Sequence, residues 1–479
     1  MEHIKKGVEQ ARDKKLRRTA PTVSAVLDDK SIVETVYDPA RHATHFVVSK
    51  NGEMREVEYL DLPDGRRLVP LSGSNNLLTH HVVLLPERAD DFGSKAELLA
   101  RIKALIHRYV DLSPLFERIA AHYVLLSWLY DGLHETPYLR VRGEPGSGKT
   151  RFLLTVGSLC YKPIFASGAS TVSPIFRMLD LVRGTLVFDE ADFRFSDEKA
   201  EVVKILNNGT TRGFPVLRAE QNQTTKEFNP TAFHVFGPKL IATRDSFEDR
   251  ALETRFISEQ MAGRRLRRDV PISLTDDHAA EARILRNQLL SFRFQHHSTG
   301  FRPVTPDDAL EPRVNQMFGP LLALIDDDET RQAVRALAAE YSGQTACDRS
   351  LDADGQIIEA IHALMKTRPV PPSIRSITHA LTRADSDAPA PWTPRLVGQV
   401  VRRKLGLRTV RLNDGHYVAP TETPRLLAHF ERLGLPPLLG ARSLRTPHSL
   451  TPMDARSGAV NEAHQMITGD ASLGAPMAS

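Results

Sequence analysis

The stretch Gly143-Glu144-Pro145-Gly146-Ser147-Gly148-Lys149-Thr150 decides the fold of this chain. It satisfies every fixed position of the pattern G-x-x-x-x-G-K-[ST]. Its glycines let backbone N–H groups turn inward around a polyphosphate, so all eight residues are candidates for nucleotide binding. The Lys149 ammonium suits the β- and γ-phosphates, and the Thr150 hydroxyl can bind Mg²⁺. The motif therefore predicts a site for ATP and Mg²⁺.

The residues on either side of this loop suit that function. Tyr138-Leu139-Arg140-Val141 is a β-favouring run that predicts a strand entering the loop, and residues 151–160 predict the helix that leaves it. The first amides of that helix, starting with Arg151, would complete the anion site. The bare motif also occurs by chance. Its setting, with a second nucleotide motif nearby, favours a working phosphate site.

The composition is that of an ordinary globular chain. The length of 479 residues allows about three domains, and 41% of the residues are hydrophobic. A net charge of +4 permits a nucleic-acid partner without requiring one. The cysteines, Cys160 and Cys347, are too few for a disulfide framework or a zinc cluster. There is no apolar run long enough to span a membrane and no signal peptide, so we expect a cytoplasmic protein without a membrane partner.

Six segments are predicted along the chain. They are a basic arm with a small β-rich domain (1–90), a helical linker (91–137), a core of alternating strands and helices (138–262), a helical lid (263–368), a helix–hairpin module (369–422) and a disordered tail (423–479). The Lys- and Arg-rich residues 1–18 suit a nucleic-acid-binding arm, although a solvated helix face is the simpler interpretation.

The core segment has the pattern of a parallel α/β sheet. Strands are predicted at 138–141, 163–166, 185–188, 240–243 and 256–257, with helices starting at Ser173-Pro174 and spanning 198–206. Short apolar strands that alternate with helices are typical of a sheet with crossover helices. In the preceding linker, Ser94 with Glu97 predicts a capping box, and Ser113-Pro114 predicts the start of a second helix.

Two of the predicted strands end in polar residues that suit nucleotide hydrolysis. Asp189 and Glu190 follow an apolar strand. Asp189 would hold Mg²⁺, and Glu190 would orient and deprotonate the attacking water. An acidic pair that only caps the next helix is the alternative. Thr243 ends the strand at 240–243, where it would help to position the water, unless it closes the strand for propensity alone.

The run Asp249-Arg250-Ala251-Leu252-Glu253-Thr254-Arg255-Phe256 completes a set of motifs that resembles the AAA+ ATPase family. The resemblance implies a P-loop NTPase core with a helical lid. It also implies that Arg255, or as second choice Arg250, is an arginine finger that neutralises charge in a neighbouring subunit's site. An ion pair of Arg255 with Glu248, Asp249 or Glu253 is the alternative. A finger acting in trans implies a homo-oligomer, such as a hexameric ring.

The lid contains one further candidate. Arg313 directly follows Pro312 at the start of a predicted helix. The family resemblance implies a second-sensor arginine at such a position, contacting the nucleotide. A solvated arginine at a helix start fits the sequence equally well.

A narrower resemblance covers residues 120–262, with a weaker echo to about residue 420. The runs 206–218 and 236–242 are similar to the ATPase modules of phage, plasmid and prophage primase–helicase proteins. The zinc-binding and acidic primase motifs of fuller members are absent, so primer synthesis is not implied. Residues 214–228 predict a β-hairpin. The resemblance implies that such a hairpin touches DNA, with Arg218 and Lys226 as phosphate contacts, and an ordinary surface hairpin is the alternative.

The module at 369–422 has the pattern of a winged helix-turn-helix. Helices are predicted at 373–381 and from Thr393-Pro394 to Leu405, followed by a hairpin with its turn at Asn413-Asp414-Gly415. The candidate DNA contacts share a positive charge and lie on the second helix or the hairpin: Arg395, Arg402, Arg403, Lys404, Arg408 and Arg411. Winged helices also bind proteins, so a protein-docking role is the alternative.

Together these features predict an ATPase that acts on DNA, as a helicase or replication-initiation ATPase of a mobile element. A DNA-binding regulator or helicase loader that uses ATP as an assembly switch is the second hypothesis. A protein-remodelling ATPase is the third.

Overall fold

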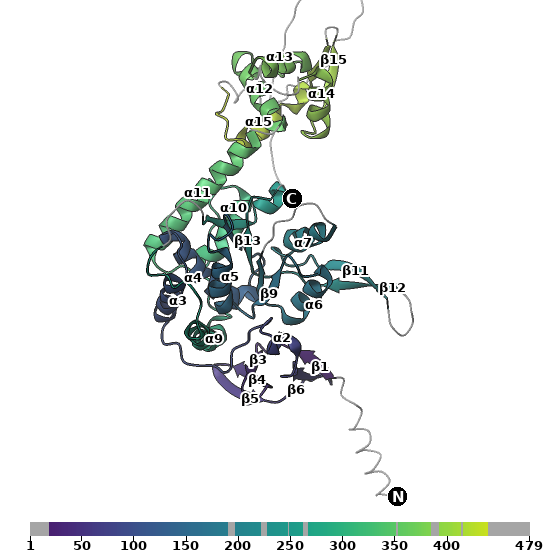
Figure 1. The fold of residues 1–479 in the computed structure, drawn as a ribbon. Helices are drawn as coiled ribbons and strands as arrows, with labels where there is room; N and C mark the ends of the chain where they lie inside the picture. Colours follow the sequence, from purple (N-terminus) through teal and green to yellow (C-terminus); the bar gives the residue numbers. More distant parts are fainter. Residues whose placement is uncertain are drawn as a thin grey trace, which may run out of the picture. The chain divides into compact units, whose positions relative to one another are not determined.

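The computed structural model describes residues 19–189, 197–221, 228–247, 249–261, 267–350, 353–384, 392–412 and 415–438. The chain divides into two compact units, Met1–Thr345 and Ala346–Ser479. The first contains the predicted phosphate loop (Figure 1). Among the predicted site residues, Glu190 and Lys226 lie outside the described residues. No helix in the described part of the chain has the length and apolar character needed to cross a membrane.

A five-stranded, all-parallel sheet forms the centre of the first unit. In spatial order its strands are β14 (Phe256–Gln260), β8 (Tyr138–Arg142), β13 (Lys239–Thr243), β10 (Leu186–Asp189) and β9 (Ile164–Ser167). All the strands that the sequence predicts for this sheet are present. Strand β13 lies between β8, which enters the phosphate loop, and β10, which ends at Asp189.

Helices cover both faces of this sheet (Figure 1). Successive side chains of a strand point to opposite faces, so each strand contributes to two cores. Leu139 and Leu240 belong to one core, with residues from α3 (Lys95–Tyr109), α4 (Pro114–Leu129), α5 (Lys149–Leu159) and α9 (Asp276–His296). Tyr138 and Ile241 belong to the other, with residues from α6 (Val172–Val182) and α7 (Asp197–Asn208). The central strands are therefore apolar on both sides.

The helix ends follow local rules that the sequence shows. Ser94 and Glu97 form the predicted capping box of α3, and Ser113 caps α4 ahead of Pro114. Helix α6 starts at Val172, two residues before the predicted first helical residue, Pro174. Thr171 takes the cap position there, so that Pro174 falls within the first turn, where its missing N–H costs nothing.

Two small sheets precede the core. The elements are β1 (Thr19–Thr22), β2 (Ser24–Val26), β3 (Ile32–Asp38), β4 (Ala43–Lys50), β5 (Glu53–Val57), β6 (Leu60–Asp61), β7 (Arg67–Pro70) and α2 (Asn76–Thr79). One sheet has the order β2-β3-β4-β5 and the other β1-β7-β6. Buried Val33, Phe46, Val48 and Leu68 form a small core of their own.

The rest of the first unit comprises short connecting elements and the lid helices. They are η1 (Tyr130–Gly132), the hairpin β11 (Val216–Gln221) and β12 (Phe228–Phe233), α8 (Arg250–Glu253), α10 (Pro312–Leu322) and α11 (Asp328–Ser350), which continues into the second unit. The hairpin extends beyond the predicted 214–228. Its second strand runs on to Phe233, because that ring packs 6.3 Å from the ring of Phe176.

The second unit consists of α12 (Ala353–Thr367), α13 (Ile374–Ala384), α14 (Pro394–Arg403), β15 (Thr409–Leu412), β16 (Gly415–Val418), η2 (Pro420–Glu422) and α15 (Thr423–Arg432). Two predictions are wrong here. Helix α12, assigned to the lid, packs into this core through Ile358 and Ile361. Residues 423–432, assigned to a disordered tail, form α15, because Leu426 and Phe430 are one helical turn apart and bury together.

A buried ionic network joins the small N-terminal sheets to the core. Arg293 of α9 donates to Glu34 of β3 at 2.7 Å and to Asp131 at 2.6 Å, and its side chain is 1% exposed. The Tyr161 hydroxyl donates to Glu34 at 2.5 Å. Burial by itself would raise the pKa of Asp131, but the charge and hydrogen bonds of Arg293 lower it far below its usual value. One guanidinium therefore satisfies carboxylates from two parts of the fold.

We predict that Arg293→Met lowers the free energy of unfolding by about 3–5 kcal/mol, because it leaves buried carboxylates without their cation. Denaturant unfolding followed by circular dichroism measures this loss. The matched control is Arg302→Met, because Arg302 pairs with Asp326 at 2.9 Å with a side chain that is 60% exposed. It should cost less than about 1 kcal/mol. Equal losses in the two variants would contradict the prediction.

Candidate nucleotide site

The phosphate loop turns at the carboxyl end of β8. Gly146 and Gly148 adopt φ values of +81° and +96°, a backbone region that other residues rarely enter. Gly148 is the residue before α5, so the helix begins at Lys149. The Lys149 ammonium donates to the carbonyls of Gly143 and Glu144 at 2.5 and 2.9 Å. The predicted lysine therefore lies over its own loop, at the amino end of a helix whose free N–H groups favour anions.

The parallel sheet brings the second motif to the same edge. The Thr150 hydroxyl donates to Asp189 Oδ2 at 2.7 Å, across 39 residues of sequence. A hydroxyl and a carboxylate are oxygen ligands of the class that Mg²⁺ prefers. The pair therefore fits the predicted metal-binding role.

Thr243 lies at the tip of β13, next to the loop. The Gly143 N–H donates to the Thr243 carbonyl at 3.3 Å. The side chain of Thr243 is 2% exposed, and its hydroxyl has no hydrogen-bond partner among the described residues. The same holds for the hydroxyl of Ser147 in the loop. Buried hydroxyls are normally paired, so two unpaired ones at this edge suggest groups that a ligand would satisfy.

Arg151 does not point at the loop. Its guanidinium donates to the carbonyls of Pro271 and Ile272, which ties α5 to the segment after the core. The predicted contact of Arg151 with an anion can therefore come from its backbone N–H, which lies in the first turn of α5, and not from its side chain.

Arg255 lies at the opposite edge of the sheet. Its carbonyl accepts from the Tyr138 N–H at 3.0 Å, at the start of β8, whereas the loop follows the end of that strand. At about 3.3 Å per residue, β8 separates the two by roughly 16 Å. The Arg255 guanidinium donates to the carbonyls of Ala251 and Asn207. The guanidinium forms no ion pair with Asp249 or Glu253, although the charge of Asp249 acts on it. Glu248, the third carboxylate of that alternative, lies outside the described residues.

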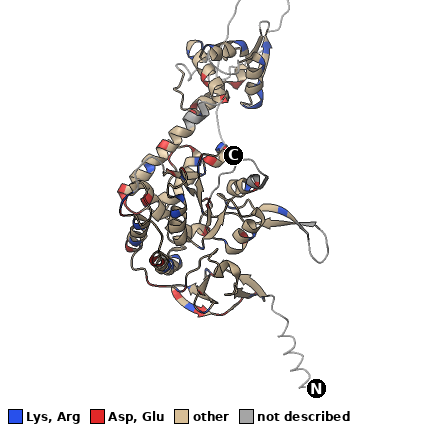
Figure 2. Cartoon of the chain, viewed as in Figure 1, with Lys and Arg blue, Asp and Glu red and all other residues tan. Residues whose placement is uncertain are grey.

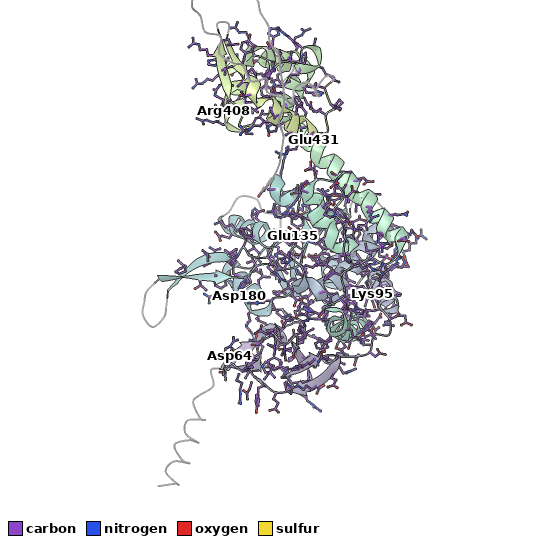
Figure 3. All side chains as sticks on the ribbon, turned by 180° about the vertical axis from the view of Figure 1, so that it is seen from behind. Asp64, Lys95, Glu135, Asp180, Arg408 and Glu431 are labelled. Carbon is purple, nitrogen blue, oxygen red and sulfur yellow. The ribbon has the colours of Figure 1, made fainter. Side chains whose placement is uncertain are left out.

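Arg313 lies beside Arg255 and not beside the phosphate loop. The two side chains share one shallow pocket with Glu135, which Figure 3 labels. Burial and the nearby charge of Arg313 lower the pKa of Arg255. Arg313 itself donates to Gln316 and Thr210 at 3.1 and 3.4 Å. A contact of Arg313 with the nucleotide of its own chain is therefore wrong, because α10 begins at the far edge of the sheet.

Arg140 is a buried arginine near this site that the sequence reasoning missed. It is buried in β8 and holds Glu253 of α8 with both ends of its guanidinium. Burial would raise the pKa of Glu253, but the hydrogen bond and charge of Arg140 lower it. This pair fixes the short helix that carries Arg250, which is exposed, and leads to Arg255. The sequence does show an arginine within an otherwise apolar strand, and this pattern indicates a buried acidic partner.

The predicted DNA contacts differ in how accessible they are. Arg218 on β11 forms an ion pair with Glu201 and lies 4.4 Å from the Phe176 ring centroid, so its charge is already engaged. The predicted cations of the second unit are all exposed: Arg395, Arg402, Arg403, Lys404, Arg408 and Arg411. Figure 2 shows Lys and Arg at several places on this unit, with fewer acidic residues, and Figure 3 labels Arg408 there. Thr393 caps α14 ahead of Pro394, as predicted.

The comparisons with known proteins are distant. No family model and no curated protein matches the chain. Among solved structures, the C-terminal region of NrS-1 is similar over 81% of this chain and 95% of that chain, at 9% identity and a TM-score of 0.32. JCV helicase is similar over 57% and 66%, at 14% identity and a TM-score of 0.25. RuvB of Thermotoga maritima is similar over 68% and 96%, at 13% identity and a TM-score of 0.21.

TM-scores of this size establish neither a shared fold nor a shared function. The chain's own geometry is that of a mixed α/β unit with a five-stranded parallel sheet and a glycine-rich loop between β8 and α5. This arrangement is consistent with the P-loop NTPase-like fold that the sequence predicts.

We predict that Thr243→Val lowers nucleotide hydrolysis about 100-fold while leaving the stability of the fold unchanged or higher. A buried hydroxyl without a partner costs roughly 1–3 kcal/mol, and its removal should not destabilise the protein. Steady-state hydrolysis and denaturant unfolding measure the two effects. Thr185→Val is the control, because Thr185 also has a buried hydroxyl without a described partner but directly precedes β10, at the end of that strand away from the loop. It should leave hydrolysis unchanged, and equal losses in both variants would contradict the role of Thr243.

Proposed function

We propose that this protein is an oligomeric, Mg²⁺-dependent ATPase of AAA+ type that acts on DNA. Helicase or replication-initiation work for a mobile element is its specific task in this proposal. The observation that carries it is the hydrogen bond from Thr150 to Asp189 at the mouth of the Gly143–Thr150 loop. The bond supports the proposal because it joins two oxygen groups of the class that Mg²⁺ prefers beside a glycine-rich loop suited to phosphates.

Each described residue at this edge has a separate task in hydrolysis. The loop amides and the amino end of α5 hold the phosphates, and Lys149 offsets their charge. Thr150 and Asp189 hold Mg²⁺, which when bound offsets charge on the β- and γ-phosphates. Thr243 accepts or donates a hydrogen bond to the attacking water. Glu190, the residue after β10, takes the proton of that water in this proposal, although it lies outside the described residues.

The two arginines at the opposite edge serve a neighbouring subunit in this proposal. Arg255 and Arg313 form no ion pair with a described carboxylate, and a strand of five residues separates them from the loop of their own chain. Cations held in place by carbonyl and amide oxygens keep their charge available for an anion from outside. A closed ring would bring this edge against the next subunit's phosphate loop.

Action on DNA is the second part of the proposal. The exposed cations of α14, β15 and the segment between them suit the phosphate backbone, in the order of elements expected for a winged helix-turn-helix. Lys404 and Arg408 have only distant acidic neighbours in this unit, at 4.0 Å (Asp354) and 3.9 Å (Glu422). The Lys404 and Arg408 side chains are themselves 63% and 84% exposed, so in this proposal they can bind DNA phosphates.

We predict that the wild-type protein hydrolyses ATP and that Lys149→Ala lowers the rate at least about 100-fold, because charge on the γ-phosphate is no longer offset. Steady-state hydrolysis is measured with and without single- and double-stranded DNA. Lys204→Ala is the control, since Lys204 lies on α7 with a side chain that is 57% exposed. It should behave as the wild type.

The three functional hypotheses separate in this assay. Stimulation by DNA supports the DNA-directed ATPase, and strand displacement then distinguishes a helicase from an ATP-switched loader or regulator. Hydrolysis that responds to a protein substrate and not to DNA supports a remodelling ATPase. A folded, assembled wild type without any hydrolysis would rule out the catalytic assignment.

Mixing two inactive variants tests the role in trans. We predict that Arg255→Ala and Lys149→Ala are each inactive, and that an equimolar mixture recovers activity. In a randomly mixed ring, roughly a quarter of the interfaces pair an intact loop with an intact arginine. Hydrolysis by the mixture, compared with each variant alone after the same subunit exchange, measures this recovery. No recovery in rings shown to be mixed would contradict a contribution from the neighbouring subunit.

A further inference from the structure

A second cavity, of about 480 Å³, lies at the base of the β11–β12 hairpin. We call it the hairpin-base pocket. Its walls come from the edge strand β2, the η1 turn, the end of α6, and the segments that enter and leave the hairpin, together with Tyr161 and His297. The residues that matter for its chemistry are Arg183, Arg212, Phe214, His234 and Phe236. None of them belongs to the nucleotide site or to the predicted DNA contacts.

An exposed aromatic ring stands at the mouth of this pocket. Phe214 is 66% exposed, although a phenylalanine normally buries most of its surface. Gly213 before it adopts a φ of +101°, and a Cβ added there would meet nothing within 4 Å. Backbone conformation, and not crowding, therefore requires glycine at this position. The turn that results presents the Phe214 ring outward, beside the cavity.

Two arginines of the pocket are held in place by hydrogen bonds to carbonyls and not by ion pairs. The Arg212 guanidinium donates to the Asp131 carbonyl and lies 5.4 Å from the Phe236 ring centroid. Arg183, in the left-handed region at φ +49°, bonds through Nε to the Asp180 carbonyl at 3.3 Å. Neither guanidinium forms an ion pair with a described carboxylate.

Asp131 is the carboxylate that lines the pocket, and Asp180 lies near the pocket without lining it. The Asp131 carboxylate bonds to Arg293 at 2.6 Å, and His297 lies 3.1 Å from it. Asp180, labelled in Figure 3, accepts from the His234 N–H at 3.0 Å. The balance of charge facing the cavity is therefore positive, which favours an anionic ligand.

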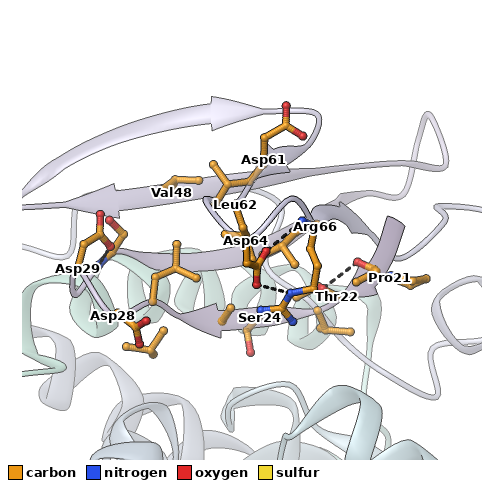
Figure 4. A pocket seen from close by; sticks show the side chains of 18 of the residues that line it. Pro21, Thr22, Ser24, Asp28, Asp29, Val48, Asp61, Leu62, Asp64 and Arg66 are labelled. Atoms are coloured by element: carbon orange, nitrogen blue, oxygen red, sulfur yellow. Dashed lines mark hydrogen bonds and ion pairs between the residues drawn. The ribbon is translucent and has the colours of Figure 1, made fainter. Parts of the chain in front are cut away.

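A larger groove beside β1 and β2 makes a useful contrast. It measures about 860 Å³, and Figure 4 shows the side chains that line it. Two of its cations are paired within the groove: Arg66 with Asp64 at 2.6 Å and Lys50 with Asp29 at 2.7 Å. Paired charges of this kind offer little to a phosphate. Arg183 lines both cavities, whereas Arg212 lines the hairpin-base pocket and not this groove, and its guanidinium bonds to a carbonyl.

We infer that the hairpin-base pocket binds single-stranded nucleic acid, with one unpaired base stacked on Phe214 and the adjoining phosphates held by Arg183 and Arg212. Aromatic rings interleaved with cations are how proteins hold single strands without reading their sequence. A base within a duplex is stacked on both faces and cannot cover the Phe214 ring. This inference deepens the proposed action on DNA, since it locates a strand contact on the ATPase unit.

The test uses full-length protein in which Arg402, Arg403, Arg408 and Arg411 are replaced by Ala, so that the second unit does not mask the pocket. Fluorescence anisotropy then measures binding of labelled single-stranded oligo(dT) and of the matching duplex. Phe214→Ala should weaken single-strand binding roughly 5- to 100-fold, and Phe214→Trp should retain it. Leu217→Ala is the control, because Leu217 is 65% exposed on the same hairpin but does not line the pocket.

Salt dependence tests the arginines separately. Arg183→Ala with Arg212→Ala should flatten the dependence of log affinity on log salt by about 1.4, since each single-strand phosphate contact contributes about 0.7. The control pair Arg302→Ala with Arg335→Ala changes exposed arginines elsewhere in the same unit. Their slope should remain that of the parent protein.

Three results would overturn the pocket: no residual oligo(dT) binding in the parent variant, wild-type binding by Phe214→Ala, or equal losses in Phe214→Ala and Leu217→Ala. DNA-independent ATP hydrolysis, measured in parallel, keeps this result apart from the proposed function. If hydrolysis is intact and Phe214→Ala binds oligo(dT) as the parent does, the inference about the pocket is wrong and the proposed ATPase function stands. If binding depends on Phe214 but the protein does not hydrolyse ATP, the proposed ATPase function is wrong and the inference about the pocket stands.

Discussion

Covering both faces of one parallel sheet is the constraint on which the rest of this structure depends. Parallel strands need crossover connections, and these place helices on both faces and all carboxyl ends at one edge. That geometry brings Thr150, Asp189 and Thr243 together, although 93 residues separate the first from the last in sequence. The loop glycines then supply the one conformation that lets the backbone turn there.

The residues of the proposed site lie at two opposite ends of the parallel strands. The phosphate loop lies at the carboxyl edge, whereas Arg255 and Arg313 lie at the amino edge, beside the start of β8. A single chain cannot join them across the length of a strand. In the proposed function, a second copy of the chain supplies these arginines to the phosphate loop.

Buried charged residues connect distant elements of the first unit through ion pairs, which the amino-acid composition does not reveal. Arg293 joins Glu34 and Asp131, and Arg140 joins Glu253 of the helix next to Arg255. Each is a buried guanidinium whose carboxylates come from elsewhere in the sequence, so removing one partner leaves the other uncompensated. The arginines of the hairpin-base pocket contrast with these, because their guanidinium groups bond to carbonyls and form no ion pair with a described carboxylate.

Local sequence determined the phosphate loop, the strands of the parallel sheet, the capped helices α3, α4 and α14, and Asp189 and Thr243 at strand tips. These features depend on short-range rules: glycine at positive φ, hydroxyl caps, and apolar strands buried on both faces. Only the tertiary structure decided which elements pack together. It placed Arg313 beside Arg255, moved α12 from the lid into the second core, ordered α15 through Leu426 and Phe430, and lengthened the hairpin to Phe233. An apolar stripe on a helix, or a lone arginine, indicates that the segment needs a packing or charge partner. That partner lies far away in the chain, so no local sequence pattern identifies it.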